Sequence, residues 1–214
     1  MEIEVKYAIP DKEIADAIWR DEFINSLIIG NSAETVVMKG VYFDTDDYRL
    51  SERNITVRVR AEGDNIIGTL KYGRGSDGAL AEREEVNIPL EGEEYFIFPP
   101  VDMFKESPDG LDLMEIIGDK TLVNLLETRF LRRRARIGYG DSIMELAIDT
   151  GDIVTDKGNV PILEMELELF SGNKEDLTEL GERLAFRYEL IPERRSKFSR
   201  GRRLLMGPPK SASV

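Results

Sequence analysis

Apolar and polar residues alternate in many short stretches of this chain, and this period of two predicts β-strands. Eight such stretches are predicted as strands, near residues 2–9, 34–45, 54–62, 65–73, 82–89, 128–139, 142–150 and 159–170. Helical spacing of apolar residues occurs at 10–28, 113–126 and 174–187, and a short basic helix is predicted at 194–205. Many strands with few helices favour a barrel or a strongly curved sheet over a doubly wound fold.

Charged residues occupy one face of almost every predicted strand. Side chains at positions i, i+2 and i+4 share a face, so Glu164, Glu166 and Glu168 form one acidic row, opposite a row of Leu and Met. Glu2 and Glu4 start a second row on the first strand. Basic or mixed rows follow from the same spacing at Lys6, at Arg58 and Arg60, at Arg83 and Glu85, and at Arg132, Arg134 and Arg136.

In an ordinary half-buried sheet such charged rows would simply face water. Three glutamates in one row repel one another, however, and rows of arginines have the same problem with the opposite sign. A closed barrel with its charged faces turned inward resolves both, because acidic and basic rows then oppose each other across a polar lumen. The expected fold is therefore α+β, an eight-stranded antiparallel closed β-barrel whose apolar outer face is covered by the helices.

The same inside-out pattern describes an outer-membrane barrel. Charged helices between the strands and the density of lumen charge argue against that alternative. The N-terminus carries charges where a signal peptide needs an apolar core, and no apolar run approaches the length of a membrane helix. A soluble, cytoplasmic protein is expected.

Composition excludes several kinds of function. The formal net charge of −13 argues against nonspecific binding to nucleic acid or acidic membranes, which both require a positive surface. The chain has no cysteine and no histidine, which excludes disulfides, thiolate and imidazole metal sites and the Ser-His triad. Catalysis must then rest on carboxylates, Lys, Arg, Tyr, Ser or a hard metal ion held by oxygen ligands.

A lumen with clustered carboxylates and clustered basic groups suits a metal-bound polyanion. Carboxylates hold magnesium together with phosphate oxygens and water, and Arg and Lys bind the remaining phosphate oxygens. This arrangement reconciles an acidic protein with an anionic substrate.

Short motifs in this chain resemble those of the CYTH superfamily, the triphosphate tunnel metalloenzymes. Residues 2–6 resemble the family's ExExK signature, and residues 163–169 resemble its acidic E-x-E-x-E strand. Further similarities, in family order, lie at 42–45 (YFDT), 57–60 (L-R-x-R), 69–71 (the lysine strand), 83–85 (R-x-E), 148–151 (D-x-G) and 196–201 (S-K-x-x-R-G). Asn87 departs from the pattern, since some members carry another acid there. The resemblance predicts a CYTH domain over 1–205, followed by a tail or linker at 206–214.

The resemblance implies roles for individual residues. Magnesium or manganese, as one or two ions, is expected on Glu2, Glu4, Glu164, Glu166 and Glu168. Phosphate binding is expected from Lys6, Arg58, Arg60, Lys71, Arg83, Arg132, Arg134, Lys197 and Arg200. Glu4, Glu166 and Lys6 are the candidate catalytic residues. Glu85 and Asp149 are open cases, because they could position metal or water or simply pair with nearby arginines.

The function implied is metal-dependent hydrolysis of a triphosphate, with inorganic tripolyphosphate, cleaved to pyrophosphate and phosphate, as the leading hypothesis. Thiamine triphosphatase, nucleoside triphosphatase and class IV adenylate cyclase activity are alternatives in the same tunnel. A non-catalytic polyphosphate- or nucleotide-binding module is the alternative of another class. The expected partner is a small anionic substrate, without nucleic acid or membrane, and the oligomeric state stays open.

Overall fold

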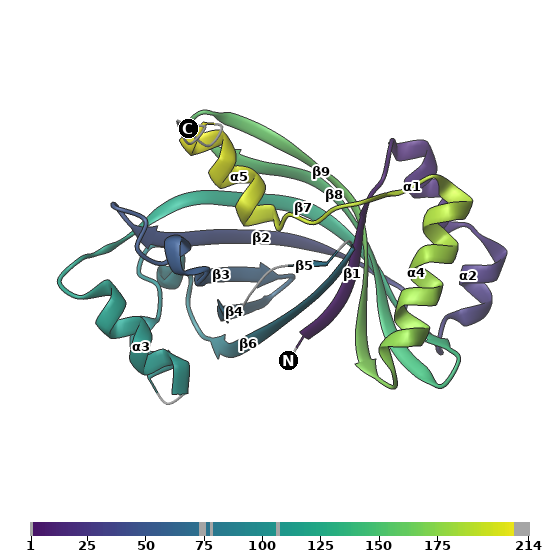
Figure 1. Cartoon of the computed structure of the whole chain (residues 1–214), viewed down its shortest axis with the longest axis horizontal. Coiled ribbons are helices and arrows are strands. Elements are labelled where there is room, and N and C mark those ends of the chain that lie inside the picture. The colour runs from purple at the N-terminus through teal and green to yellow at the C-terminus, as the bar shows by residue number, and fades with distance from the viewer. Residues whose placement is uncertain (1, 73–75, 78, 106–107, 208–214) are drawn as a thin grey trace, which may run out of the picture.

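The protein forms a single curled antiparallel sheet with helices outside it (Figure 1). The computed structural model describes residues 2–72, 76–77, 79–105 and 108–207. Eight long strands carry the sheet, and they are β1 (Glu2–Ala8), β2 (Glu34–Thr45), β3 (Thr56–Glu62), β4 (Asn65–Tyr72), β6 (Leu80–Leu90), β7 (Leu122–Tyr139), β8 (Ser142–Thr155) and β9 (Gly158–Ser171). Each corresponds to one of the strands predicted from the alternating pattern.

Pairing between the first and the last strand of the ring closes the barrel. The order is β1-β9-β8-β7-β2-β3-β4-β6, and β6 returns to pair antiparallel with β1, where Glu2 lies opposite Arg83. Two short strands, β5 (Ser76–Asp77) and β10 (Ile191–Pro192), extend the sheet at β6 and β1. The structure thus confirms the predicted antiparallel barrel with external helices.

Two groups of helices cover the apolar outer face. Helices α1 (Lys12–Trp19), α2 (Glu22–Leu27) and α4 (Lys174–Tyr188) pack on β1 and on β7 to β9. Helix α3 (Pro108–Ile117) and the 3₁₀ turns η2 (Glu93–Phe96) and η3 (Val101–Phe104) belong to the cluster that covers β2 to β4. A third 3₁₀ turn, η1 (Ser51–Arg53), follows β2. With the outside buried in this way, the alternate residues of each strand face the lumen.

Helix α5 (Lys197–Met206) differs from the other helices because it packs on lumen-facing residues. Phe198 stacks on Tyr42, with ring centroids 5.4 Å apart, and joins Leu126 and Ile153 in a separate apolar cluster. Gly201 permits this approach, since a Cβ added there would lie 2.6 Å from Leu126 Cδ2. The helix therefore closes part of the lumen, as Figure 1 shows for the yellow segment lying across β7 to β9.

Two predicted helices were partly wrong. The expected helix at 10–28 is two helices, because the Asp21 side chain accepts hydrogen bonds from the backbone N–H of Phe23 and Ile24 and starts a new one. The expected helix at 113–126 ends at Ile117, and residues from Leu122 onward belong to β7. A leucine-rich run fits both periods, and pairing with β2 decides in favour of the strand.

At the C-terminus, the predicted basic helix starts at Lys197 with Ser196 as its N-cap. The expected tail overlaps the end of α5 at Met206, and its residues 208–214 lie outside the described part of the chain. In that part of the chain, no helix combines the length and apolarity that crossing a membrane would need.

Replacing Gly201 by Val is expected to loosen α5 and lower the free energy of unfolding by about 1–3 kcal/mol, the usual cost of overpacking. The added methyl groups would collide with Leu126 and Ile153. Urea unfolding measures the change, with Ser199→Val on the exposed side of the same helix as the control. Equal stability of the two variants would contradict close packing of α5.

Candidate active site

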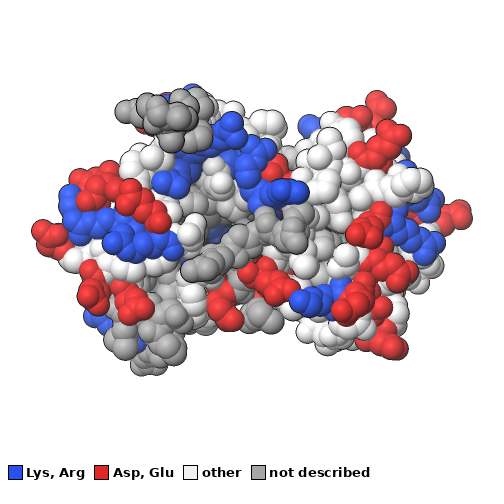
Figure 2. Space-filling view, in the orientation of Figure 1, with Lys and Arg blue, Asp and Glu red and all other residues white. Residues whose placement is uncertain are grey.

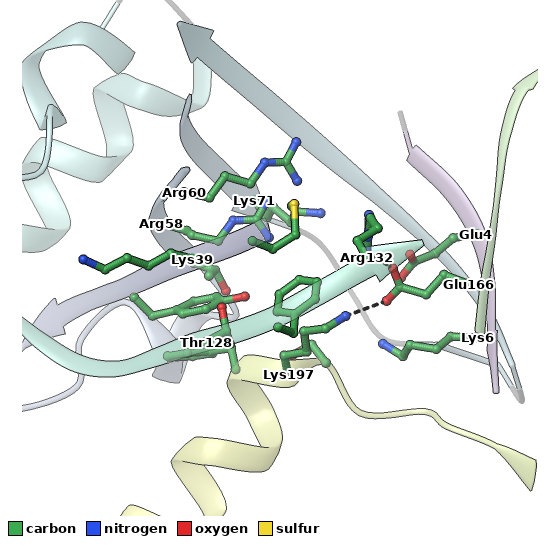
Figure 3. A pocket seen from close by; sticks show the side chains of 17 residues that line it. Glu4, Lys6, Lys39, Arg58, Arg60, Lys71, Thr128, Arg132, Glu166 and Lys197 are labelled. Carbon is green, nitrogen blue, oxygen red and sulfur yellow. Dashed lines mark hydrogen bonds and ion pairs between the residues drawn. The ribbon is translucent and has the colours of Figure 1, made fainter. Parts of the chain in front are cut away.

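Eight of the predicted site residues line one cavity inside the barrel. Strand register places them on the inward face, for example Lys6 opposite Glu166 and Glu4 opposite Glu168. The cavity is lined by eight of them, Glu4, Lys6, Arg58, Arg60, Lys71, Arg132, Glu166 and Lys197, together with Met38, Gly40, Tyr42, Thr128, Phe130 and Phe198 among others. Figure 3 shows Arg58, Arg60 and Lys71 on one side and Glu4, Glu166 and Lys6 on the other.

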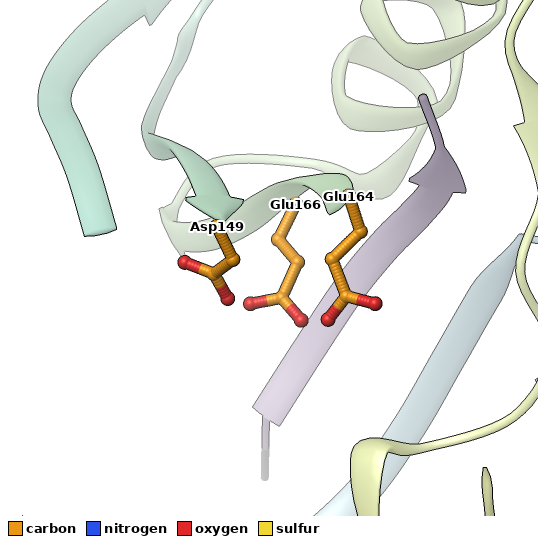
Figure 4. A group of neighbouring side chains, drawn as sticks. All are labelled: Asp149, Glu164 and Glu166. Carbon is orange, nitrogen blue, oxygen red and sulfur yellow. The ribbon is translucent and has the colours of Figure 1, made fainter. Parts of the chain in front are cut away.

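Three carboxylates, from Asp149, Glu164 and Glu166, meet in the lumen with oxygens within 4.8 Å of one another (Figure 4). Such a group could hold a cation, but positive side chains already surround it. The Arg132 guanidinium binds both oxygens of Asp149, each at 2.7 Å, and reaches Glu166 at 2.5 Å. Lys197 contacts all three carboxylates. Arg200 contacts Glu164 as a third cation. This group, called here the paired acidic cluster, is therefore internally neutralised.

The pKa values in the paired acidic cluster follow from burial and from these cations. Burial alone would raise the pKa of Glu166, but Lys197 and then Arg132 hold it well below its usual value. At Glu164, which is 0% exposed, burial outweighs Lys197 and the pKa is raised. Arg200 also binds the Glu164 carboxylate.

A second acidic group lies further along β1 and β9, and two of its three carboxylates, those of Glu4 and Glu168, lack such compensation. Glu168 is directly opposite Glu4 on β1 and Glu145 on β8. Burial first, and then repulsion by Glu2, Glu4 and Glu145, raises the pKa of Glu168 to about 7. Within the described ranges, neither Glu4 nor Glu168 forms an ion pair. We call Glu2, Glu4 and Glu168 the unpaired acidic group, although Glu2 does contact Lys71 at 2.8 Å.

The opposite wall carries basic side chains with spare binding capacity. The Nε atoms of Arg58 and Arg60 are buried and, among described residues, have no hydrogen-bond acceptor. Burial and then the neighbouring Arg58 charge lower the pKa of Arg60, although Arg60 contacts Glu62 at 3.4 Å. Lys71 lies between Glu2 and Glu85, at 2.8 and 2.7 Å. Burial would raise the pKa of Glu85, but the charges of Lys71 and then Arg58 outweigh it and lower this pKa to about 2.

Lys6 is a third cation with spare capacity. Lys6 is only 5% exposed, and its ammonium forms no ion pair with any residue that the structure describes. In Figure 3 it lies beside Glu166, at the edge of the same cavity. Its charge attracts Glu164 and Glu166 but makes no close contact with them, so the buried ammonium has capacity for an anion from outside the chain.

The remaining predicted residues are engaged elsewhere or not described. Arg134 binds Glu62 and, at 2.8 Å, Glu34 near the far end of the lumen. Arg83 pairs through its backbone with Glu2, and its side chain lies outside the described part of the structure. The roles assigned to all these residues from the resemblance stay proposals.

Sequence reasoning missed two lumen acids, Glu145 and Glu62. Glu145 shares the inward face of β8 with Asp149, and Glu62 shares that of β3 with Arg58 and Arg60, so the period of two contained the signal. Burial outweighs the attraction of Arg134 and Arg132 and raises the pKa of Glu145. When it is ionised, the Glu145 carboxylate repels that of Glu168.

Positive charge reaches the surface next to the lumen. Figure 2 shows Lys and Arg side chains gathered along α5, beside the hollow at the centre of this face. The chain as a whole is acidic, with a net charge of −13. On this face, basic groups therefore lie beside the lumen although the net charge of the chain is negative.

A closed antiparallel barrel with acidic and basic walls facing one lumen defines a tunnel-type protein. The chain belongs to the CYTH family, because the model of the CYTH domain matches residues 1–201. This confirms the family read from the motifs.

Known proteins of similar sequence and shape agree with that family. An inorganic triphosphatase of Haemophilus influenzae is 30% identical over 173 residues, which is 78% of this chain and 46% of the relative. The chain thus spans about half the length of that curated relative.

Two solved structures share the fold. A Hippeastrum protein, described as a candidate adenylyl cyclase with a dominant triphosphatase activity, is 18% identical, with a TM-score of 0.66 over 94% of this chain and 95% of the other. A candidate adenylate cyclase of Bacillus halodurans, also 18% identical, has a TM-score of 0.54 over 92% of each chain.

Replacing Glu168 by Gln is expected to flatten the pH dependence of stability in the metal-free protein. The pKa of Glu168 is about 7 in the fold against an ordinary 4.5, so between these values the folded state keeps a proton that the unfolded state has lost. Native stability from this group is therefore present at low pH and falls as the pH rises towards 7. Gln cannot lose that proton, so E168Q should be more stable than the parent at about pH 8, by roughly 1–3 kcal/mol.

Urea unfolding with a chelator, between about pH 5 and pH 8, measures this difference. Glu13→Gln, on the exposed surface of α1, serves as the control and should retain the parental slope. A parental slope in E168Q would show that Glu168 ionises normally.

Proposed function

We propose that this chain catalyses metal-dependent hydrolysis of a triphosphate, with inorganic tripolyphosphate cleaved to pyrophosphate and phosphate. One observation carries the proposal, which is that a single lumen holds carboxylates without a cation on one wall and basic groups with spare binding capacity on the other. Among the described residues Glu4, Glu168 and Lys6 form no ion pair. Arg58 contacts Glu85 at 3.9 Å and Arg60 contacts Glu62 at 3.4 Å, but the buried Nε atoms of both arginines have no acceptor. A divalent cation together with a polyphosphate supplies both missing partners at once.

The unpaired acidic group fits a hard divalent cation. Oxygen ligands from Glu2, Glu4 and Glu168 are the type that magnesium and manganese prefer, and a bound cation would relieve the repulsion that raises the pKa of Glu168. When bound, such an ion supplies charge stabilisation for phosphate oxygens and lowers the pKa of a bound water. Glu164 and Glu166 are less suited to the ion, since Lys197, Arg132 and Arg200 hold them.

Basic side chains would hold the phosphate groups on the other wall. Arg58 and Arg60 can present their guanidinium groups to phosphate oxygens in the forked geometry that favours arginine. Lys6 is placed beside Glu166 to bind a phosphate oxygen near the acids. Lys71 could join them by leaving Glu2 when a cation takes that carboxylate.

The reaction proposed is attack of a water oxygen on a terminal phosphorus atom. A new P–O bond forms, the bond to the bridging oxygen breaks, and pyrophosphate leaves with that electron pair. A carboxylate of the acidic wall, Glu4 in the first instance, orients the water and accepts its proton. The cations of the opposite wall stabilise the charge that develops on the phosphoryl group and on the leaving pyrophosphate.

An organic triphosphate is the second candidate, because the cavity also has an apolar part. Met38, Phe130 and Phe198 line it together with the charged groups, and aromatic rings of this kind can pack against a base or thiazole ring. Nucleoside triphosphatase, thiamine triphosphatase and cyclase activities would each use this part of the cavity.

The cytoplasm is proposed as the setting of the reaction, with neither nucleic acid nor membrane as a partner.

Assays of product from tripolyphosphate, ATP and thiamine triphosphate, side by side with magnesium and manganese, should show the highest kcat/KM for tripolyphosphate. Glu4→Gln should then lower kcat/KM by about 100-fold or more, since a metal centre contributes several kcal/mol to such reactions. Glu82→Gln is the matched control, because Glu82 lies on β6 but contacts Lys174 outside the lumen.

Full metal-dependent activity in E4Q would refute the proposed site. A preference for ATP or thiamine triphosphate would favour the second candidate. Binding without turnover under every metal would leave only a binding module.

Replacing Arg58 by Ala is expected to lower kcat/KM by at least about tenfold, because one charge-assisted contact to phosphate is lost in a partly desolvated lumen. Arg129→Ala is the control, since Arg129 also lies on a lumen strand but is exposed and pairs with Glu127. Steady-state kinetics with tripolyphosphate measure both variants. Equal kinetics would remove Arg58 from the binding wall.

A further inference from the structure

The paired acidic cluster is balanced charge for charge. Three carboxylates face three cations, and each carboxylate oxygen has a cationic neighbour. Arg132 binds both oxygens of Asp149 and one oxygen of Glu166. Lys197 contacts Asp149 at 2.7 Å, Glu166 at 3.0 Å and one oxygen of Glu164. Arg200 contacts the other oxygen of Glu164. Formal charge inside this cluster is therefore zero.

Lys197 is the member that bridges the whole cluster. Its side chain is 9% exposed, and its ammonium also lies 5.0 Å from the centroid of the Phe130 ring. Burial alone would lower its pKa, but Asp149 and the two glutamates more than reverse this, so the pKa stands well above its usual value. The ammonium is therefore a permanent charge across the accessible pH range.

The backbone holds this ammonium in place. Lys197 is the first residue of α5, directly after its N-cap Ser196, and the next residue, Phe198, stacks on Tyr42. Since α5 is fixed against the barrel at both Phe198 and Gly201, the cation enters the cluster as part of a packed element rather than as a mobile surface side chain.

We propose that Lys197 is a positioning residue whose ammonium acts as a built-in cation of the paired acidic cluster. The cluster therefore takes no divalent ion, and the substrate-free lumen has a single ion site, at the unpaired acidic group. This inference rests on the proposed metal site and deepens it, because it assigns Glu164 and Glu166 to the lysine rather than to a metal.

Electrostatics supports this division of the acids. A divalent ion entering the paired acidic cluster would meet three resident positive charges at short range in a partly dry interior, where such repulsion is strong. Glu168 instead lies opposite Glu4 and Glu145, and among the described residues neither Glu168 nor Glu4 forms an ion pair. Lys197 also fixes one oxygen of Glu166 while Arg132 fixes the other, which orients this carboxylate toward the cavity.

Counting bound manganese by equilibrium dialysis and electron paramagnetic resonance, without substrate, tests the inference. The native chain should bind one ion and Lys197→Met should bind two, because the vacated carboxylates then carry an excess negative charge. The double variant E164Q/K197M restores the balance of two acids and two arginines, so its count should return to one. Lys174→Met, which removes an exposed lysine paired with Glu82, should bind one ion.

The difference of one bound ion between K197M and the native chain tests the role of Lys197. The number of ions bound by the native chain tests the proposed metal site. Two ions in the native chain, or an unchanged count in K197M, would overturn the role of Lys197. No ion in the native chain but one in K197M would refute the metal site and uphold the lysine. Failure of K197M to fold at any manganese concentration would also contradict the inference, since an ion should replace the ammonium.

Discussion

Neutralisation of charge inside a closed barrel is the constraint on which the rest of this structure depends. Removing a carboxylate or a guanidinium from water costs several kcal/mol unless a partner lies close, and here strands carry such groups into the lumen in rows. The barrel brings acidic β9 and basic β7 within contact, so that Arg132 can bind Asp149 and Glu166. Two sites in the lumen keep spare binding capacity. Glu168 forms no ion pair among the described residues, and across the cavity the buried Nε atoms of Arg58 and Arg60 have no acceptor, so an external cation and an anion would fit there.

Helix α5 has two roles, since it packs against the barrel and also places cations in the lumen. The other helices cover the outer surface, whereas α5 packs Phe198 on lumen residues and inserts Lys197 and Arg200 among the buried acids. Its packing and its charges support each other, because the apolar contacts fix the direction in which the basic side chains point. Closure of the lumen and the charge state of Glu166 are consequently properties of one element.

The outward apolar residues and the inward charged residues of the strands have different roles, since the former determine the fold and the latter line the lumen. Solved structures at 18% identity share the barrel over more than nine tenths of the chain, so apolar packing outside and strand pairing tolerate wide changes in sequence. The phosphate and metal chemistry that we propose would depend on the inward charged positions. Selection among triphosphates would depend on the apolar residues at the cavity wall, such as Met38, Phe130 and Phe198.

The period of two along each strand is local, and for that reason the sequence by itself determined the eight strands, the inward charged rows and the family. It failed at 113–126, where a leucine-rich run suits a helix as well as a strand and pairing with β2 decided. It also could not say which acid meets which cation, since contacts such as Lys197 with Asp149 join residues far apart in the chain. Only the register between strands and the docking of α5 separated the neutralised acids from Glu4 and Glu168, because Coulomb energy depends on distances that no local pattern contains.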